Sequence, residues 1–367
     1  MKLKDGVLMV FLAGSWLLLS GWGYKGHEII GKNSSQSFNA EMAQFDSWVP
    51  ILTSHSGDAD KRKSWDKNEG IKHYIDIDNY PEFVENGAIS QNLDTLIALH
   101  GRDFILDQGI LPWATIRAFD TLVSYFETGK FEEAALIAAD LSHYVADGHM
   151  PLHLTANYDG QLSGNDGIHS RYESTMIGKF ASQLICEGGE VSYVEDVSGY
   201  IFRYIYENNQ YVDSLINADN YAKSVNASTS SSAYSNALWE MTGDLTIDLF
   251  EDASFSLAEL IYTAWVKAGS PSFNVQLFSE KWRQNNTHLS TVYFEDNLLK
   301  VDFELAITSQ VSFDVFSLKG EKLFFQSFGQ LDGGNHQVQL PLDVSKGLYL
   351  MVFNCNGSSD SIKFNVD

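Results

Sequence analysis

The sequence contains few cysteines and few basic residues for its length. Only two of its 367 residues are cysteine, Cys186 and Cys355, and they lie far apart in the chain. This excludes a disulfide framework and predicts two buried free thiols. Lysine and arginine number 24 against 48 aspartates and glutamates, so the formal net charge is −24. Such an acidic surface disfavours non-specific binding to nucleic acid or anionic membranes, although bound divalent metals would reverse the field locally.

Long apolar runs are also missing, with one exception near the N-terminus. Residues 7–19 are mostly apolar, follow two lysines and precede two small residues. The run is shorter than the roughly 18 residues that a bilayer-spanning helix needs, and the pattern is typical of a secretory signal peptide over residues 1–21. Cleavage there would make Trp22 the first residue, whereas an uncleaved anchor is the alternative. We therefore expect a secreted or cell-surface protein that passes through the periplasm.

The spacing of apolar residues divides the rest of the chain into two regions. Over residues 22–269 they recur mostly at steps of three and four, which predicts helices. Beyond residue 289 they alternate between glycine-containing turns, as in Val311, Phe313 and Val315, which predicts a small all-β sandwich over residues 289–367. Residues 270–288 show no clear period and are expected to be a linker and packing strap. The predicted fold class is therefore mainly α, a multi-helix domain followed by a β-sandwich.

One predicted helix is apolar around most of its circumference. It begins near Phe131, is rich in alanine, and ends before Pro151. A helix of this kind is buried among other helices. It nevertheless carries His143 and Asp147, and an unpaired charge is costly in a buried position. A bound metal ion would satisfy both side chains.

Residues 140–173 hold four histidines and several acids but few bulky core residues. His143 and Asp147 are four residues apart, as are His169 and Glu173, so each pair projects from one face of a helix. His153 lies between the two pairs. Imidazole and carboxylate groups at this density are typical of a dinuclear or trinuclear metal site, and nitrogen and oxygen donors favour zinc. For any single histidine, a hydrogen-bonded structural role is the alternative.

Five short motifs carry a resemblance to a known superfamily. They are Trp22-Gly-Tyr-Lys-Gly-His27, Lys72-His73-Tyr-Ile-Asp, His143-Tyr-Val-Ala-Asp147, Pro151-Leu-His153 and His169-Ser-Arg-Tyr-Glu173. In this order they resemble the bacterial zinc-dependent phospholipases C and the single-strand-specific zinc nucleases of fungi and plants. The motifs span residues 22–173 of the predicted helical domain.

The resemblance implies three zinc ions. The first would be held by Asp60, His73, His143 and Asp147, and the second by His153, His169 and Glu173. The third would be held by His27, by Asp147 as a bridge, and by the amine and carbonyl of Trp22, which signal cleavage would complete. Asp58 is the alternative to Asp60. The resemblance also implies that Asp60 orients the attacking water.

The implied activity is that of a zinc-dependent phosphoric diester hydrolase that activates water and needs no serine or cysteine nucleophile. Two substrates stay open, a phospholipid head group and a single-stranded nucleic acid. Glu173 and the short interval from His153 to His169 resemble the phospholipases, whereas the step from Trp22 to His27 resembles the nucleases. Three tyrosines, at positions 144, 158 and 172, either contact the substrate or pack in the core. A non-catalytic surface binding protein stabilised by metal is a third hypothesis.

The C-terminal region also resembles a known module. Residues 290–367, with segments such as SFDVFSLKGEKLF and KGLYLMVF, resemble the C-terminal sorting domains of the type-nine secretion pathway of Bacteroidetes. This resemblance implies that the secretion machinery is a partner. An adhesive or glycan-binding sandwich is the alternative, and the oligomeric state stays unknown.

Overall fold

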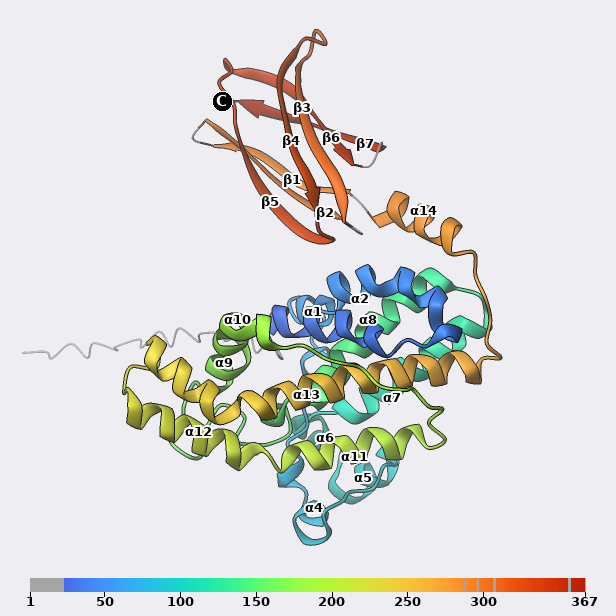
Figure 1. The fold of residues 1–367 in the computed structure, drawn as a ribbon, viewed down its shortest axis with the longest axis vertical. Helices are drawn as coiled ribbons and strands as arrows, with labels where there is room; N and C mark the ends of the chain where they lie inside the picture. The colour runs from blue at the N-terminus through green and yellow to red at the C-terminus, as the bar shows by residue number, and fades with distance from the viewer. Residues whose placement is uncertain (1–22, 287, 296, 306–307, 356–357, 367) are drawn as a thin grey trace, which may run out of the picture.

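The computed structural model describes residues 23–286, 288–295, 297–305, 308–355 and 358–366. Helices make up the chain as far as residue 286 and strands make up the rest (Figure 1), which confirms the predicted fold class. The longer helices are α1 (Gly23–Asn33), α2 (Val49–His55), α4 (Pro81–Asn86), α5 (Leu93–His100), α6 (Arg102–Gln108), α7 (Leu111–Glu127), α8 (Phe131–Gly148), α11 (Val197–Asn209), α12 (Val212–Val225), α13 (Ser232–Lys267) and α14 (Val275–Asn286).

Short helical segments lie between them. These are η1 (Ser34–Ser37), η2 (Ala40–Trp48), α3 (Asp58–Arg62), η3 (Gly70–Lys72), η4 (Ile77–Asn79), η5 (Pro151–His153), α9 (Ile168–Ser170), the π-helical η6 (Arg171–Met176), α10 (Ile177–Phe180) and η7 (Ala181–Gln183). The strands are β1 (His288–Glu295), β2 (Leu298–Leu305), β3 (Ser309–Ser317), β4 (Lys322–Leu331), β5 (Gly334–Pro341), β6 (Gly347–Cys355) and β7 (Ser358–Val366).

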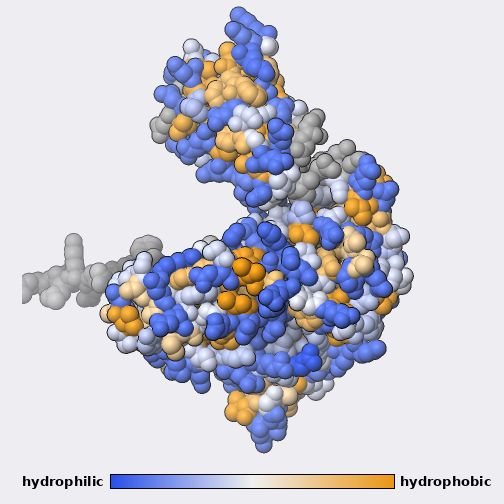
Figure 2. Space-filling model, viewed as in Figure 1, coloured by the Kyte–Doolittle hydropathy of each residue, from blue (hydrophilic) through white to orange (hydrophobic). Residues whose placement is uncertain are grey.

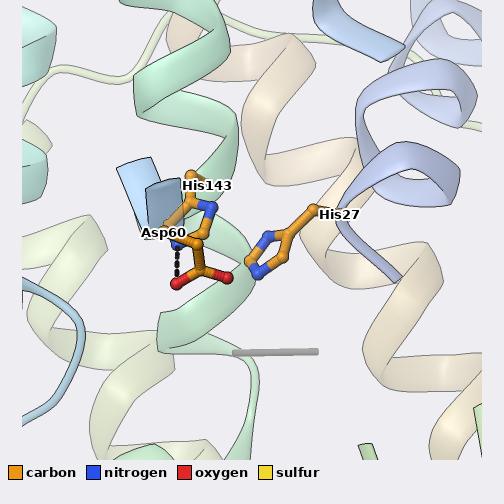
Figure 3. Close-up of side chains that lie close together, drawn as sticks. All are labelled: His27, Asp60 and His143. Carbon is orange, nitrogen blue, oxygen red and sulfur yellow. Dashed lines mark ion pairs between the residues drawn. The ribbon is translucent and has the colours of Figure 1, made fainter. Parts of the chain in front are cut away.

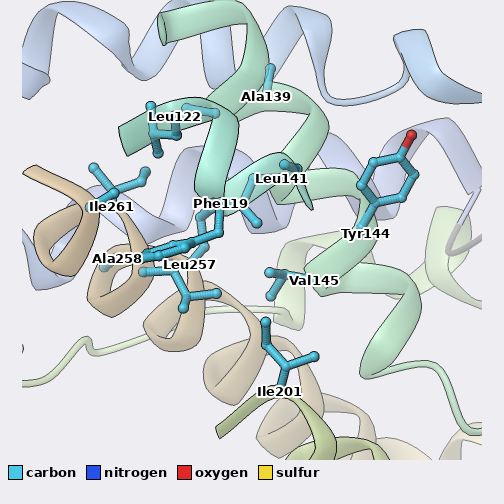
Figure 4. Close-up of a cluster of buried hydrophobic side chains, with 14 of the residues drawn as sticks. Phe119, Leu122, Ala139, Leu141, Tyr144, Val145, Ile201, Leu257, Ala258 and Ile261 are labelled. Atoms are coloured by element: carbon cyan, nitrogen blue, oxygen red, sulfur yellow. The ribbon is translucent and has the colours of Figure 1, made fainter. Parts of the chain in front are cut away.

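Helix α8 lies in the middle of the helical domain, as its apolar circumference predicts. Four of its alanines are completely buried, and small side chains allow the neighbouring helices to approach closely: Ala134, Ala135, Ala138 and Ala139. Figure 4 shows α8 packed between Phe119 and Leu122 of α7 and Leu257 and Ile261 of α13. The C-terminal half of α8 is therefore held rigidly by its neighbours.

Helix α1 packs against α2 through a glycine. A Cβ atom on Gly31 would lie 2.3 Å from the carbonyl oxygen of Leu52, so no larger residue fits without a shift of the backbone. Gly31 follows His27 by one helical turn on α1. The close approach of the two helices therefore sets the depth at which His27 is buried.

Residues 270–288 contain a helix that the sequence pattern did not predict. Phe278 and Trp282 of α14 are four residues apart and both are buried. The ring of Trp282 meets the ring of His55 edge-on, with centroids 5.6 Å apart. The expectation of a segment without a regular period was wrong, because two apolar anchors are too few to make a helical period visible in the sequence.

The strands form two antiparallel sheets, in the orders β1-β2-β5 and β4-β3-β6-β7. Phe303 of one sheet packs against Phe313 and Phe353 of the other, with ring centroids 5.4 and 5.0 Å away. This confirms the predicted all-β domain. Figure 2 shows a notch between this domain and the helical domain on the side opposite α14. Elsewhere the two touch, since His55 Nε2 lies 3.8 Å from the Glu304 carboxylate.

The cysteine prediction is confirmed, because Cys186 and Cys355 are free and buried. None of the described helices combines the length and the apolar character needed to cross a bilayer. The predicted signal peptide over residues 1–21 and Trp22 lie outside the described residues.

Candidate metal centre

The two four-residue pairs converge as their spacing predicts. On α8, His143 Nε2 lies 3.2 Å from Asp147 Oδ2, and both side chains are completely buried. His169 on α9 and Glu173 on η6 approach to 3.1 Å between Nε2 and Oε2. The second pair spans the junction into a π-helical turn, a local distortion that is frequent at functional sites.

Four donor atoms from three segments form the first cluster. His73 Nδ1 lies 2.8 Å from His143 Nε2 and 3.0 Å from Asp147 Oδ2. Asp60 Oδ1, from α3, lies 3.5 Å from His73 Nδ1 and 3.6 Å from His143 Nε2. Ligands of a tetrahedral zinc ion with bonds of roughly 2.0–2.1 Å lie about 3.3 Å apart. The spacing of these four donors therefore matches a tetrahedral metal site.

The second cluster joins η5 to the α9–η6 segment. His153 Nε2 lies 3.2 Å from His169 Nε2, and the two nitrogens lie 3.6 and 3.1 Å from Glu173 Oε2. His153 Nδ1 donates to the carbonyl of His73, and His169 Nδ1 donates to the carbonyl of Tyr158. A carbonyl only accepts, so in the neutral rings both Nε2 atoms carry lone pairs that face each other. A cation between them would remove this repulsion.

His27 forms the third cluster with two residues of the first. Its ring stacks on the ring of His143 with centroids 3.8 Å apart, and Asp60 lies beside both (Figure 3). Its Nε2 lies 3.7 Å from Asp147 Oδ1. Burial, together with His143, lowers the pKa of His27 to about 3. The ring is therefore neutral and able to act as a ligand, and the third site needs further donors, which the sequence assigned to Trp22.

Asp147 is the carboxylate that the three clusters share. Its Oδ2 faces His73 and His143, while its Oδ1 faces His27 and lies 3.2 Å from His153 Nδ1. Burial alone would raise the pKa of Asp147, but His143 and His153 outweigh it and hold the pKa well below its usual range. Burial likewise opposes the charge on His153, yet Asp147 raises the pKa of that ring to about 10. The centre therefore stabilises positive charge around one buried carboxylate.

Several buried polar atoms of the centre lack a hydrogen-bond partner. They are both ring nitrogens of His27, both carboxylate oxygens of Asp147, Asp60 Oδ1, His73 Nε2 and Glu173 Oε2. A buried group left unpaired costs about 1–3 kcal/mol, and more if it is charged. Metal ions among these donors would satisfy most of them at once. The residues present therefore fit a zinc centre.

The structure separates the two candidate aspartates of the GDADKRK segment. Asp60 lies in the first cluster, whereas Asp58 accepts a hydrogen bond from Lys61 and contacts His55 Nδ1 at 2.7 Å. Asp58 is thus engaged outside the cluster. All eight described ligands that the sequence named lie in the three clusters, and Trp22 falls outside the described residues.

Other residues singled out by the sequence have different surroundings. His149 is buried, stacks on Tyr204 and contacts the carbonyl of Val145. Burial lowers the pKa of His149 to about 4. Tyr172 is completely buried and bonded to Thr246, so it packs in the core. Only Tyr158 of the three tyrosines is exposed beside the second cluster.

Sequence reasoning missed Glu69, which is completely buried beside the first cluster. Its Oε1 lies 3.6 Å from His73 Nε2 and accepts a hydrogen bond from the Tyr144 hydroxyl. A four-residue step separates Glu69 from His73, the same signal that identified the other pairs. A cavity of about 390 Å³ adjoins the cluster through Glu69 and Tyr144 and extends between α7 and α8.

Comparisons with known proteins leave the family of this chain open. No family model matches it. It is 31% identical over 96 residues to a probable serine protease of Bradyrhizobium tropiciagri, and the match covers 22% of this chain but only 12% of that protein. The alpha toxin of Clostridium absonum resembles it with a TM-score of 0.43 and 10% identity over 95% of this chain and 97% of the toxin. For the alpha-toxin of an avian Clostridium perfringens strain, the values are 0.44 and 11% over the same shares. At these values neither likeness establishes an activity.

Proposed function

We propose that the chain is a secreted zinc-dependent phosphodiesterase that hydrolyses phospholipid head groups in the manner of a phospholipase C. The observation that carries the proposal is the set of three donor clusters around the single buried carboxylate of Asp147. A structural zinc site is closed by four protein ligands, whereas the second and third clusters offer three described donors each. Open positions of this kind favour catalysis over a purely stabilising role.

The zinc ions would be held by the eight described ligands together with Trp22, as the sequence resemblance implies. When bound, zinc supplies Lewis acidity and lowers the pKa of water to about 7. The histidines are oriented for this task because the Nδ1 atoms of His143, His153 and His169 donate to the backbone carbonyls of residues 56, 73 and 158. These bonds leave Nε2 as the ligand atom and fix the plane of each ring.

Asp60 is the residue that we assign to orienting the attacking water. It is the most exposed carboxylate of the centre, with 16% of its side chain accessible. Burial would raise the pKa of Asp60, but His143 and Lys63 outweigh it and lower the pKa, so the group stays ionised. Lys63 Nζ lies 2.6 Å from Asp60 Oδ1 and places a positive charge at the same edge. An anionic phosphodiester would meet this edge first.

The acidity around the second cluster supports a phospholipid rather than a nucleic acid strand. Asp78 accepts hydrogen bonds from Thr155 and Ala156, directly after His153. Burial raises the pKa of the neighbouring Asp76 to about 7, with contributions from Asp78 and Asp107. A strand with many phosphates is repelled by such a surface, whereas a single phosphodiester with a cationic head group is not.

The C-terminal β-sandwich would serve export. Its seven strands form two sheets, which suits the sorting-domain resemblance seen in the sequence. In this proposal the type-nine secretion machinery recognises the sandwich and releases or attaches the enzyme at the cell surface. The intact mass of the secreted protein tests both ends of the chain, because it reports whether residue 22 comes first and whether residues 289–367 are retained.

A substrate panel tests the proposed activity. The secreted protein, loaded with zinc, is incubated with phosphatidylcholine vesicles, single-stranded DNA and single-stranded RNA. We expect release of phosphocholine and no cleavage of either strand at the same enzyme concentration. Strand cleavage without phosphocholine release would favour the nuclease alternative. Zinc binding without hydrolysis of any phosphodiester would support the metal-stabilised binding protein instead.

Neighbouring aspartates provide a matched test of the role of Asp60. Asp60→Asn removes a charged ligand and the water-orienting group, so we expect kcat to fall by about 10²–10³-fold, which corresponds to roughly 3–4 kcal/mol. Asp58→Asn leaves the centre intact, and we expect activity within about twofold of wild type. Steady-state kinetics with phosphatidylcholine measure both variants. Equal losses in the two variants would contradict the assignment.

A further inference from the structure

Among the ligand histidines of the first two clusters, His73 presents a different nitrogen. His143, His153 and His169 direct Nε2 into the centre and donate Nδ1 to carbonyl oxygens. His73 instead directs Nδ1 toward His143 and Asp147. Its Nε2 therefore points away from the cluster and has no hydrogen-bond partner within 3.5 Å. This ring needs another acceptor to fix its tautomer.

Glu69 is the acceptor that the fold places there. Its Oε1 lies 3.6 Å from His73 Nε2, slightly beyond hydrogen-bond length, with both side chains buried. Once Nδ1 binds a metal, Nε2 must carry the proton, and a shift of less than 1 Å would complete the bond to Glu69.

The Glu69 carboxylate is held by three other donors. Tyr144, the residue after His143 on α8, donates to Oε1 at 2.5 Å, and Arg62 approaches the same oxygen at 3.3 Å. Lys72 donates to Oε2 at 2.5 Å. Two cations thus compensate a buried carboxylate, which stays ionised and fixed in place. A fixed anion is a stronger acceptor for an imidazole N–H than a neutral group is.

We propose that Glu69 is a positioning residue for the metal centre. It accepts the Nε2 proton of His73, selects the tautomer that presents Nδ1, and increases the affinity of that nitrogen for zinc. The inference rests on the proposed function in assuming that zinc occupies the first cluster. Glu69 itself contacts neither the metal nor the substrate.

The experiment is a zinc competition titration of Glu69→Gln, which keeps the side-chain shape but removes the charge. We expect one zinc-binding step to weaken by about 10–100-fold. The His73 signals in a long-range ¹H–¹⁵N spectrum, assigned with His73→Ala, should lose the Nε2–H tautomer seen in the wild type. In a His73→Ala background, Glu69→Gln should weaken zinc binding no further, because the interacting ring is gone.

Glu82→Gln is the matched control. Glu82 Oε1 contacts His100 Nε2 at 2.8 Å, so it forms the same kind of pair, and neither residue belongs to the three clusters. This variant should bind zinc like the wild type. If Glu69→Gln does not fold, Tyr144→Phe replaces it, since it removes one donor to Glu69, and a weakening below about tenfold is expected.

Two results would overturn the inference. One is wild-type zinc affinity together with an unchanged His73 tautomer in whichever of the two variants folds. The other is an equal loss of affinity in the His73→Ala background, which would show a general structural role. Since no substrate enters these measurements, a wild-type protein that binds zinc but cleaves no phosphodiester would refute the proposed function alone. A wild-type protein that binds no zinc would refute both.

Discussion

Removal of zinc by a chelator is expected to abolish hydrolysis and to lower the thermal midpoint of the helical domain by about 8–16 °C. The physical reason is that the seven orphaned donor atoms of the centre lose their common partner. A ligand at 1,000 times its dissociation constant stabilises the folded state by about 4 kcal/mol for each site. In a domain of this size, 1 kcal/mol shifts the midpoint by roughly 2–4 °C. Even one emptied site therefore gives a shift of this order.

Differential scanning calorimetry and phosphocholine release, each with and without chelator, measure the two effects. Re-addition of zinc should restore both activity and midpoint, whereas magnesium should restore neither, because it prefers all-oxygen sites. Full activity after exhaustive chelation, verified by a metal content below detection, would refute the metal-dependent mechanism. An unchanged midpoint would show that the donors are satisfied without metal.

Asp147→Asn is expected to be the most damaging single substitution in the centre. Asp147 is the only side chain that faces members of all three clusters, and an amide replaces one of its carboxylate oxygens with a donor group. We expect kcat/KM to fall by about 10³-fold or more, roughly 4 kcal/mol, and fewer than three zinc ions to remain bound. Metal analysis and steady-state kinetics on the folded, monodisperse fraction measure both quantities.

Asp219→Asn is the control for burial. Asp219 is also completely buried, but it pairs with Arg171 and Lys223 outside the centre. Its substitution should lower stability, because a buried pair loses a charged partner, while zinc content and kcat stay near wild type. If Asp147→Asn retained three zinc ions and most of its activity, the shared-carboxylate geometry would have no catalytic meaning.

The donor residues on α8 and on the α9–η6 segment follow directly from the sequence. His143 with Asp147, and His169 with Glu173, are local pairs, so the pitch of a helix brings them together whatever the rest of the chain does. Glu69 carries the same spacing relative to His73, and the signal was available but not recognised. The buried character of α8 was equally visible, because its alanines and apolar residues leave no polar face.

Choices between equivalent neighbours needed the tertiary structure. Asp58 and Asp60 lie on the same short helix, and only the pairing of Asp58 with His55 and Lys61 shows which one faces the cluster. In β6 both faces of the strand are apolar, so alternation does not tell inside from outside. Phe353 is buried because it pairs with Phe313, whereas Leu348 is 43% exposed.

The sequence by itself determined the fold class and the chemistry of the donors, because helical period, strand alternation and residue type are local properties. Only the tertiary structure decided how these donors combine. His27, Asp60 and His73 reach α8 across about 70–116 residues of chain, through contacts such as Gly31 on Leu52 and Ile75 on His153. Such contacts depend on the packing of the whole helical domain, which no single stretch of sequence encodes.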